Sequence, residues 1–316
     1  MSKASRLAND WMLPGAIVLG VSLYLLYHFT PELHAYQKQL HFVVSEGQRL
    51  VIAILLFFQF VKISPHDLKL TRWHVLALAL QVGSFLILAY AVSRVADGTG
   101  RMLLECAMLC MICPTASAAG VITEKLGGSL AGTVTYLVMI NLAGTFLIPL
   151  VIPMVNPSAT MGFWAYVGHI ALKVFPVLVL PGLLAWTIRY TTHKLQMRLM
   201  RWSSNSFYVW GVGLTLAMIL ATRALMESGL GAAAVAGIVL VSVFCCFVQF
   251  FAGRHMEADI VSSLTAGQAL GQKNTGFLIW LGYNYMTPVT SVAGGLYAIW
   301  QNLFNSRELY RKQHQG

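Results

Sequence analysis

Ten apolar stretches, each about 20 residues long, follow one another along this chain. They are centred near residues 20, 54, 82, 111, 140, 173, 213, 239, 270 and 294. A helix of that length crosses the roughly 30 Å hydrocarbon core of a bilayer, where only helices and closed barrels satisfy the backbone. A composition of 57% hydrophobic and 10% charged residues is typical of integral membrane proteins. We therefore predict an all-α membrane protein with ten transmembrane helices in one integral membrane unit, residues 1–316.

The basic residues follow a membrane topology rather than a nucleic-acid surface, although the net charge is +10. With a cytoplasmic N-terminus, fourteen Lys and Arg residues fall on the cytoplasmic side of the spans and five on the opposite side. This is the positive-inside bias of membrane proteins. We predict a multi-pass protein of the inner (cytoplasmic) membrane with both termini in the cytoplasm, the lipid bilayer around it and no nucleic-acid partner.

A basic connection at residues 189–204 divides the chain near its middle. Five predicted spans lie on each side of it, in residues 1–154 and 160–306. Because an odd number of spans makes the second half enter the membrane in the opposite sense, the division predicts two inverted five-helix repeats, as in many secondary transporters.

The fourth and ninth spans are interrupted at corresponding places in the two halves. Residues 113–120 read Cys-Pro-Thr-Ala-Ser-Ala-Ala-Gly, and residues 265–274 read Thr-Ala-Gly-Gln-Ala-Leu-Gly-Gln-Lys-Asn. Proline removes a backbone donor and glycine weakens a helix, and paired interruptions of this kind indicate a binding site near the membrane midplane. We predict that both spans are discontinuous, near residues 114–120 and 267–273, and that they cross there. A proline kink and a separate polar loop are the alternative.

Lys273 lies inside the second interruption. A cation in the middle of a bilayer costs from about 3 to over 10 kcal/mol, so we expect Lys273 to face a cavity, a buried partner or a ligand. A lysine that extends to the membrane interface is the alternative, and the segment on either side of Lys273 is too long to favour it.

Other polar groups in the spans give weaker signals. The five cysteines all lie in predicted spans, but no set of His or carboxylate ligands accompanies them, so we expect neither a metal site nor disulfides. Glu105 serves either as a proton relay or as the i,i+4 partner of Arg101, and we favour the pair. Trp280, Tyr283 and Tyr285 suggest an interfacial aromatic belt. No catalytic motif is present, which argues against an enzyme.

Three stretches of the chain resemble the bile acid:sodium symporter family. Residues 113–123 are similar to the family's Cys-Pro-Gly-Gly-Thr-Ala-Ser-Asn segment, residues 271–276 to Gly-x-Gln-Asn-Ser-Gly, and residues 288–302 to Pro-x(11)-Trp-His-Asn. The resemblance implies a core of spans three to five and eight to ten, with spans four and nine crossing at unwound centres. It also implies a panel of spans one, two, six and seven, a substrate cavity between panel and core, and alternating access by movement of one against the other.

Family members hold two sodium ions with oxygen ligands around the crossing, and this chain lacks most of those oxygens. The positions equivalent to the ion site are Gln81, Ala119, Gly120, Thr133, Ala269 and Lys273. Another family ligand position is Leu137, which has no oxygen. Lys273 brings a positive charge instead, and two like charges about 4 Å apart repel by about 4 kcal/mol at an effective dielectric of 20. Sodium is therefore a doubtful coupling ion, and no other cofactor is expected.

The sequence thus predicts a secondary active or facilitative transporter of a small organic anion, either bile-acid-like or a small carboxylate. We expect alternating access without sodium, with Lys273 in place of the bound cation. The alternatives are coupling to protons through Lys273, a sodium-coupled symporter with rearranged ligands, and a membrane sensor that no longer transports. The predicted substrate-binding residues are Gln81, Thr115, Ser117, His169, Lys173, Lys273, Asn274 and Thr275.

Overall fold

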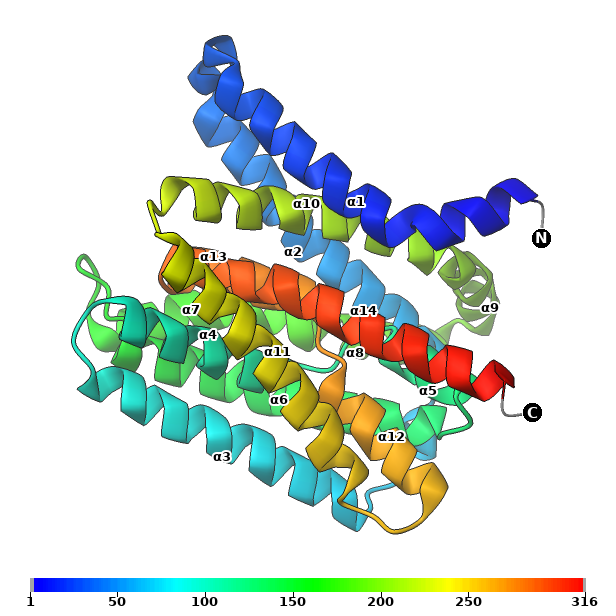
Figure 1. Cartoon of the computed structure of the whole chain (residues 1–316). Helices are drawn as coiled ribbons and strands as arrows, with labels where there is room; N and C mark the ends of the chain where they lie inside the picture. Colours follow the sequence, from blue (N-terminus) through cyan, green and yellow to red (C-terminus); the bar gives the residue numbers. More distant parts are fainter. Residues whose placement is uncertain (1–2, 315–316) are drawn as a thin grey trace.

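The computed structural model describes residues 3–314, and every regular element in that range is a helix (Figure 1). In the first half of the chain the α-helices are α1 Lys3–Phe29, α2 Gln37–Lys62, α3 Arg72–Arg94, α4 Thr99–Ile112, α5 Ala119–Lys125, α6 Leu130–Val155, α7 Phe163–Leu178 and α8 Leu180–Thr191. In the second half they are α9 His193–Trp202, α10 Ser206–Glu227, α11 Ala232–Arg254, α12 Ile260–Gly271, α13 Thr275–Tyr285 and α14 Ser291–His314. The short 3₁₀ turns are η1 Pro31–Tyr36, η2 Pro65–Asp67, η3 Ser203–Asn205 and η4 Pro288–Thr290.

Six helical segments in the described part of the chain are long and apolar enough to cross a membrane. They are Pro31–Lys62, Arg72–Arg94, Leu130–Val155, Phe163–Thr191, Ser206–Glu227 and Ala232–Arg254. The predicted fourth and ninth spans fall short because each is divided into two short helices, of 14 and 7 residues in one case and 12 and 11 in the other. The prediction of an all-α, multi-pass membrane protein is confirmed, whereas ten spans in two inverted repeats stays a prediction.

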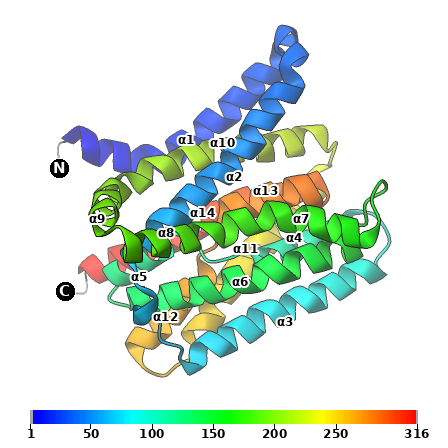
Figure 2. The same cartoon turned by 180° about the vertical axis from the view of Figure 1, so that it is seen from behind.

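Extensive packing joins the helices within and between the predicted panel and the predicted core. In the predicted panel, α1 packs on α10, α10 on α2, and α2 on α8. In the predicted core, α3 packs on α4 and α6, while α11 packs on α4, α12 and α14. Between the groups, α10 contacts α13 and α14, and α6 contacts α7. Viewed from the front and from behind, α1, α2 and α10 lie on one side and α3, α6 and α12 on the other, with both termini at the same end (Figures 1 and 2).

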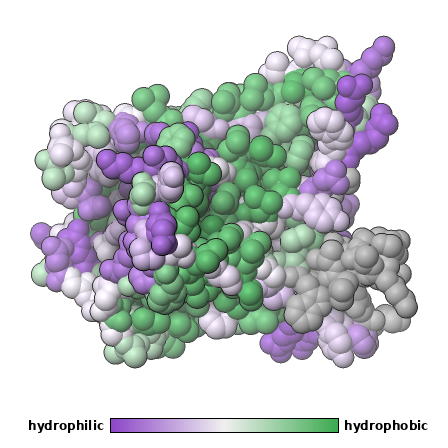
Figure 3. Space-filling view, turned by 90° about the horizontal axis from the view of Figure 1, so that it is seen from above, coloured by the Kyte–Doolittle hydropathy of each residue, from purple (hydrophilic) through white to green (hydrophobic). Residues whose placement is uncertain are grey.

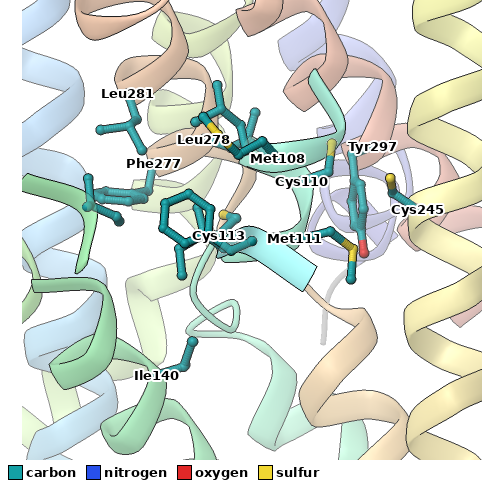
Figure 4. Packing of buried hydrophobic residues seen from close by; sticks show 14 of the residues in the cluster. Met108, Cys110, Met111, Cys113, Ile140, Cys245, Phe277, Leu278, Leu281 and Tyr297 are labelled. Carbon is teal, nitrogen blue, oxygen red and sulfur yellow. The ribbon is translucent and has the colours of Figure 1, made fainter. Parts of the chain in front are cut away.

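Apolar side chains both fill the interior and cover the outside. A continuous buried cluster, which includes Phe85, Met108, Ile140 and Phe277, joins α3, α4, α6 and α13 (Figure 4). In the space-filling view, hydrophobic residues cover the middle of the visible face and hydrophilic residues gather toward its ends (Figure 3). An apolar middle on this face suits a bilayer, because lipid tails replace water there.

Candidate functional site

The two predicted interruptions meet in the structure. The segment between α4 and α5 and the segment between α12 and α13 form an antiparallel bridge at Thr115 and Lys273. The backbone N–H of Ala116 donates to the carbonyl of Gln272 at 3.0 Å, and the N–H of Asn274 donates to the carbonyl of Pro114 at 2.8 Å. Each break therefore satisfies backbone groups that the other leaves unpaired, which membrane-buried backbone requires.

The second break is shorter than the sequence predicts. Residues 267–271 are helical, and only residues 272–274 lie between α12 and α13. The predicted unwinding from Gly267 is wrong because the glycines serve close packing. A Cβ atom on Gly267 would meet Arg254, and one on Gly271 would meet the ring of Phe250 on α11. Small residues allow the two helices to approach closely there.

Lys273 is fully buried, so the alternative of a lysine at the interface is excluded. Gln301 on α14 holds its peptide group: the N–H of Lys273 donates to Gln301 Oε1 at 2.8 Å, and Gln301 Nε2 donates to the carbonyl of Lys273 at 3.2 Å. Among the residues that the structure describes, Lys273 Nζ has no hydrogen-bond partner. The backbone is thus fixed while the amine at the end of the side chain has no partner.

A narrow cleft of about 70 Å³ borders this crossing. Helices α2 and α10 form one wall, and the two breaks with α14 form the other. Its polar lining residues are Gln48, Ser117, Gln272, Lys273, Asn274, Thr275, Gln301, Asn302 and Asn305. The structure therefore brings together four predicted substrate-binding residues, namely Ser117, Lys273, Asn274 and Thr275.

Sequence reasoning missed the contribution of α2 and α14 to this cleft. Gln48 is 1% exposed, its Oε1 has no partner, and its side chain packs over Gly276 in the first turn of α13. Asn305 on α14 is 4% exposed and its Oδ1 also lacks a partner. The signal was present, because an amide side chain inside an apolar span is costly and marks a functional candidate.

Two predicted residues at the crossing hold the backbone instead of lining the cleft. Gln81 Nε2 donates to the carbonyls of Ile112 and Cys113 at 3.2 and 2.9 Å, and its Oε1 accepts a hydrogen bond from Tyr136 at 2.6 Å. Thr115 Oγ1 donates to the carbonyl of Ala269 at 2.7 Å. Both side chains are completely buried and cap carbonyls that the broken helices leave free.

The remaining ion-site equivalents offer few oxygens. Thr133 Oγ1 donates to the carbonyl of Ser129, the N-cap of α6, at 3.0 Å. Ala119 and Ala269 are completely buried in packed surroundings. Gly120 is also buried and faces the amide of Gln59 on α2. Among residues 3–314, no group of three or more His, Cys, Asp or Glu side chains is placed to hold a metal ion.

His169 and Lys173 lie away from the cleft, which they do not line. Lys173 Nζ pairs with Glu46 on α2 at 3.5 Å, and the same carboxylate pairs with Arg49 at 2.6 Å. The ring of His169 lies edge-on to Tyr285, with 6.4 Å between centroids. Lys173 therefore pairs with the carboxylate of Glu46 on α2. Helical periodicity alone does not identify this partner.

The far end of α13 forms a second set of contacts. Trp280 is 2% exposed, so its assignment to an interfacial belt is wrong: the indole packs in the core cluster against Phe277 and Tyr285. The predicted pair of Arg101 and Glu105 is confirmed at 3.3 Å.

Beyond this end of α13 lies a polar vestibule of about 660 Å³. Its lining residues with polar side chains are Asp97, Thr99, Arg101, Glu105, Asn156, Glu227, Ser228, Tyr283 and Thr287. Tyr283 therefore borders the vestibule, whereas Thr275, at the start of the same helix, borders the cleft.

Neither a protein-family model nor a curated protein matches the sequence of this chain. Membership of the bile acid:sodium symporter family accordingly stays a proposal.

Proposed function

We propose that this protein is a membrane carrier of small organic anions that works by alternating access and without sodium, as a divergent relative of the bile acid:sodium symporters. The observation that carries the proposal is the meeting of two broken helices beside a cleft, with the buried and unpartnered Nζ of Lys273 at the crossing. Inverted-repeat transporters bind their cargo at such crossings, where half-helices end.

The helix arrangement is compatible with the ten proposed spans. These are α1, α2, α3, the α4–α5 pair, α6, the α7–α8 pair, α10, α11, the α12–α13 pair and α14. The basic helix α9 joins the two proposed repeats, residues 1–154 and 160–306. Both termini lie at one end of the molecule, as an even number of spans requires (Figure 1).

Charge and hydrogen-bonding groups favour an anionic substrate. No carboxylate lines the cleft, and Lys273 is its only charged lining residue among those described. The cleft also contains the first turn of α13, where the helix dipole favours negative charge. Asn274 caps that turn by accepting a hydrogen bond from the N–H of Phe277 at 3.2 Å.

Sodium coupling is disfavoured by the same geometry. Hard cations prefer oxygen ligands, yet Ala119, Gly120, Leu137 and Ala269 offer no side-chain oxygen. An ammonium at position 273 would also repel a sodium ion about 4 Å away by about 4 kcal/mol at an effective dielectric of 20.

The test is exchange of labelled organic anions by the purified protein in proteoliposomes, with steroid-like anions and small carboxylates compared. We expect uptake that is unchanged when potassium or choline replaces sodium at constant ionic strength. A steep, saturable sodium requirement would instead establish a sodium-coupled symporter with rearranged ligands. A dependence on the proton gradient that is lost in Lys273→Met would identify proton coupling. Binding without any exchange would indicate a sensor.

A further inference from the structure

The last three residues of α13 each contact a different residue of the predicted panel. The ring of Tyr283 lies 5.6 Å from that of His41 on α2, and the ring of Tyr285 lies 6.4 Å from that of His169 on α7. Between them, Ser45 Oγ on α2 donates to Asn284 Oδ1 at 3.3 Å. Three consecutive residues of one core helix therefore meet two panel helices.

These contacts lie between two open spaces. Helix α13 has 11 residues and so extends about 16 Å at 1.5 Å per residue. Its first residues, Thr275 and Gly276, line the cleft beside Lys273, and Tyr283 lines the vestibule at its other end. A solute passing from the vestibule to the cleft has to move past the end of α13.

Each partner is anchored on its own side of this boundary. Asn284 Nδ2 donates to the carbonyl of Trp280 at 2.7 Å, and Asn156 Nδ2 donates to the carbonyl of Tyr285 at 2.9 Å. These bonds hold Asn284 and Tyr285 on the core. The carboxylate of Glu46, one residue after Ser45, binds Arg49 and Lys173 and so ties α2 to α7 within the panel.

Each of the following ion pairs lies either within the panel or within the core. Those within the panel are Arg49–Glu46, Lys173–Glu46 and Arg223–Glu227, and those within the core are Arg101–Asp97, Arg101–Glu105 and Arg254–Glu308. The contacts that cross the boundary between panel and core at the end of α13 are one hydrogen bond, two ring contacts and the apolar packing of Tyr283 against the α10 cluster of Ala217, Leu220 and Ala221. Contacts of that kind separate without exposing an unpaired buried charge, as a reversible closure requires.

We propose that Tyr283, Asn284 and Tyr285, with His41, Ser45 and His169, form a gate that closes the cleft from the vestibule. The structure described here is the state in which this gate is shut. Separation of the three pairs lets α13 move away from α2 and α7 and connects the cleft to the vestibule. This inference rests on the proposed carrier function, in which the panel and core move against each other.

Cross-linking tests the gate directly. We expect Ser45→Cys with Asn284→Cys, joined by copper phenanthroline or a short bifunctional thiol reagent, to lose at least tenfold in anion exchange, and a reductant to restore it. The single variants treated alike are the control for modification. Ser64→Cys with Tyr190→Cys is a control for the bifunctional reagent alone, because the native hydroxyls lie 3.5 Å apart but the tyrosine ring separates the two Cβ atoms too far for a disulfide. This cross-link within the panel should leave exchange within twofold. Full exchange by the cross-linked gate would overturn the proposal.

A second measurement does not depend on transport. Ser117→Cys places a reporter thiol in the cleft, and a membrane-impermeant thiol reagent is applied from the face opposite the two termini. Tyr283→Ala should speed labelling at least fivefold, whereas Tyr190→Ala should not. Equal labelling rates would refute the gate. Faster labelling in a protein that exchanges no organic anion would refute the carrier function and leave the gate standing.

Discussion

Replacing Lys273 by methionine should have opposite effects on stability and on anion binding. The side chain is completely buried and Nζ has no partner among the described residues. Burying a polar group without a hydrogen bond costs about 1–3 kcal/mol by mutational data. Methionine has a similar length and no polar group to satisfy, and Gln301 holds only the peptide group, which the substitution keeps. We therefore expect the free energy of unfolding to rise by about 1–3 kcal/mol.

Anion affinity should fall in the same variant. A carboxylate about 6 Å from the ammonium gains about 3 kcal/mol at an effective dielectric of 20, and each 1.4 kcal/mol corresponds to a factor of ten in affinity. The expected loss is about tenfold to a hundredfold. A carboxamide analogue of the same ligand, which carries no charge, should bind both proteins equally.

The assay combines thermal unfolding in detergent with titration of the carboxylate and its carboxamide. Lys194→Met, which changes an exposed lysine on α9, is the matched control and should alter neither quantity. A variant at Lys273 that is less stable than the parent, or that binds the carboxylate within twofold of it, would refute the assignment of Lys273 Nζ as an unpartnered buried group that favours an anion.

Three further changes test the surroundings of the crossing. Gln81→Leu removes the donors to the carbonyls of Ile112 and Cys113 and the acceptor for Tyr136, and should destabilise the protein by about 2–4 kcal/mol. Tyr136→Phe removes one of these hydrogen bonds and should destabilise it by about 1 kcal/mol. Thermal unfolding measures both effects. Gly271→Ala drives a methyl group into Phe250 and should destabilise markedly, whereas Gly168→Ala enters open space and should not. A hydrogen bond from the Ser262 N–H lowers the pKa of Asp259 in the folded protein. The ionised carboxylate therefore stabilises the folded state above the unfolded pKa of about 4, and this stabilisation is lost as pH falls through the folded pKa. Asp259→Ala should thus be less stable than the parent at neutral pH, with a difference that disappears in acid.

The interruption of two spans was predictable because it depends on local chemistry. Pro114 removes a backbone donor, and the polar residues around Lys273 cannot lie against lipid. The exact end of α12 was not predictable, since Gly271 is kept helical by a neighbouring helix that presents Phe250. Local propensity favours unwinding at such glycines, and tertiary packing decides against it.

The partners of polar side chains were the least predictable feature. Periodicity places Lys173 on a helix face but does not reveal that Glu46 lies opposite. Likewise Gln81 lies at the crossing, but its amide binds backbone carbonyls and does not line the cleft. Gln48 and Asn305 each give the signal of an amide inside an apolar span, but nothing in the sequence connects that signal to this cleft. The partner of each polar side chain depends on contacts between segments that are far apart in the sequence, and such contacts cannot be read from a single sequence.

Restoring two of the symporter family's ligands should not restore sodium binding. In Ala269→Glu with Lys273→Gln, the positive charge is gone and a carboxylate is present. Leu137, Ala119 and Gly120 still provide no side-chain oxygen, however. Position 269 is completely buried, and its carbonyl already accepts a hydrogen bond from Thr115. A new carboxylate there has neither room nor enough partners to bind sodium, and an unpaired buried charge is strongly destabilising. We expect the double variant to unfold at a lower temperature than the parent, by the same amount in sodium as in potassium. Stabilisation specific to sodium would mean that backbone carbonyls at the crossing form most of an ion site, and Lys273 alone would then keep sodium out of it.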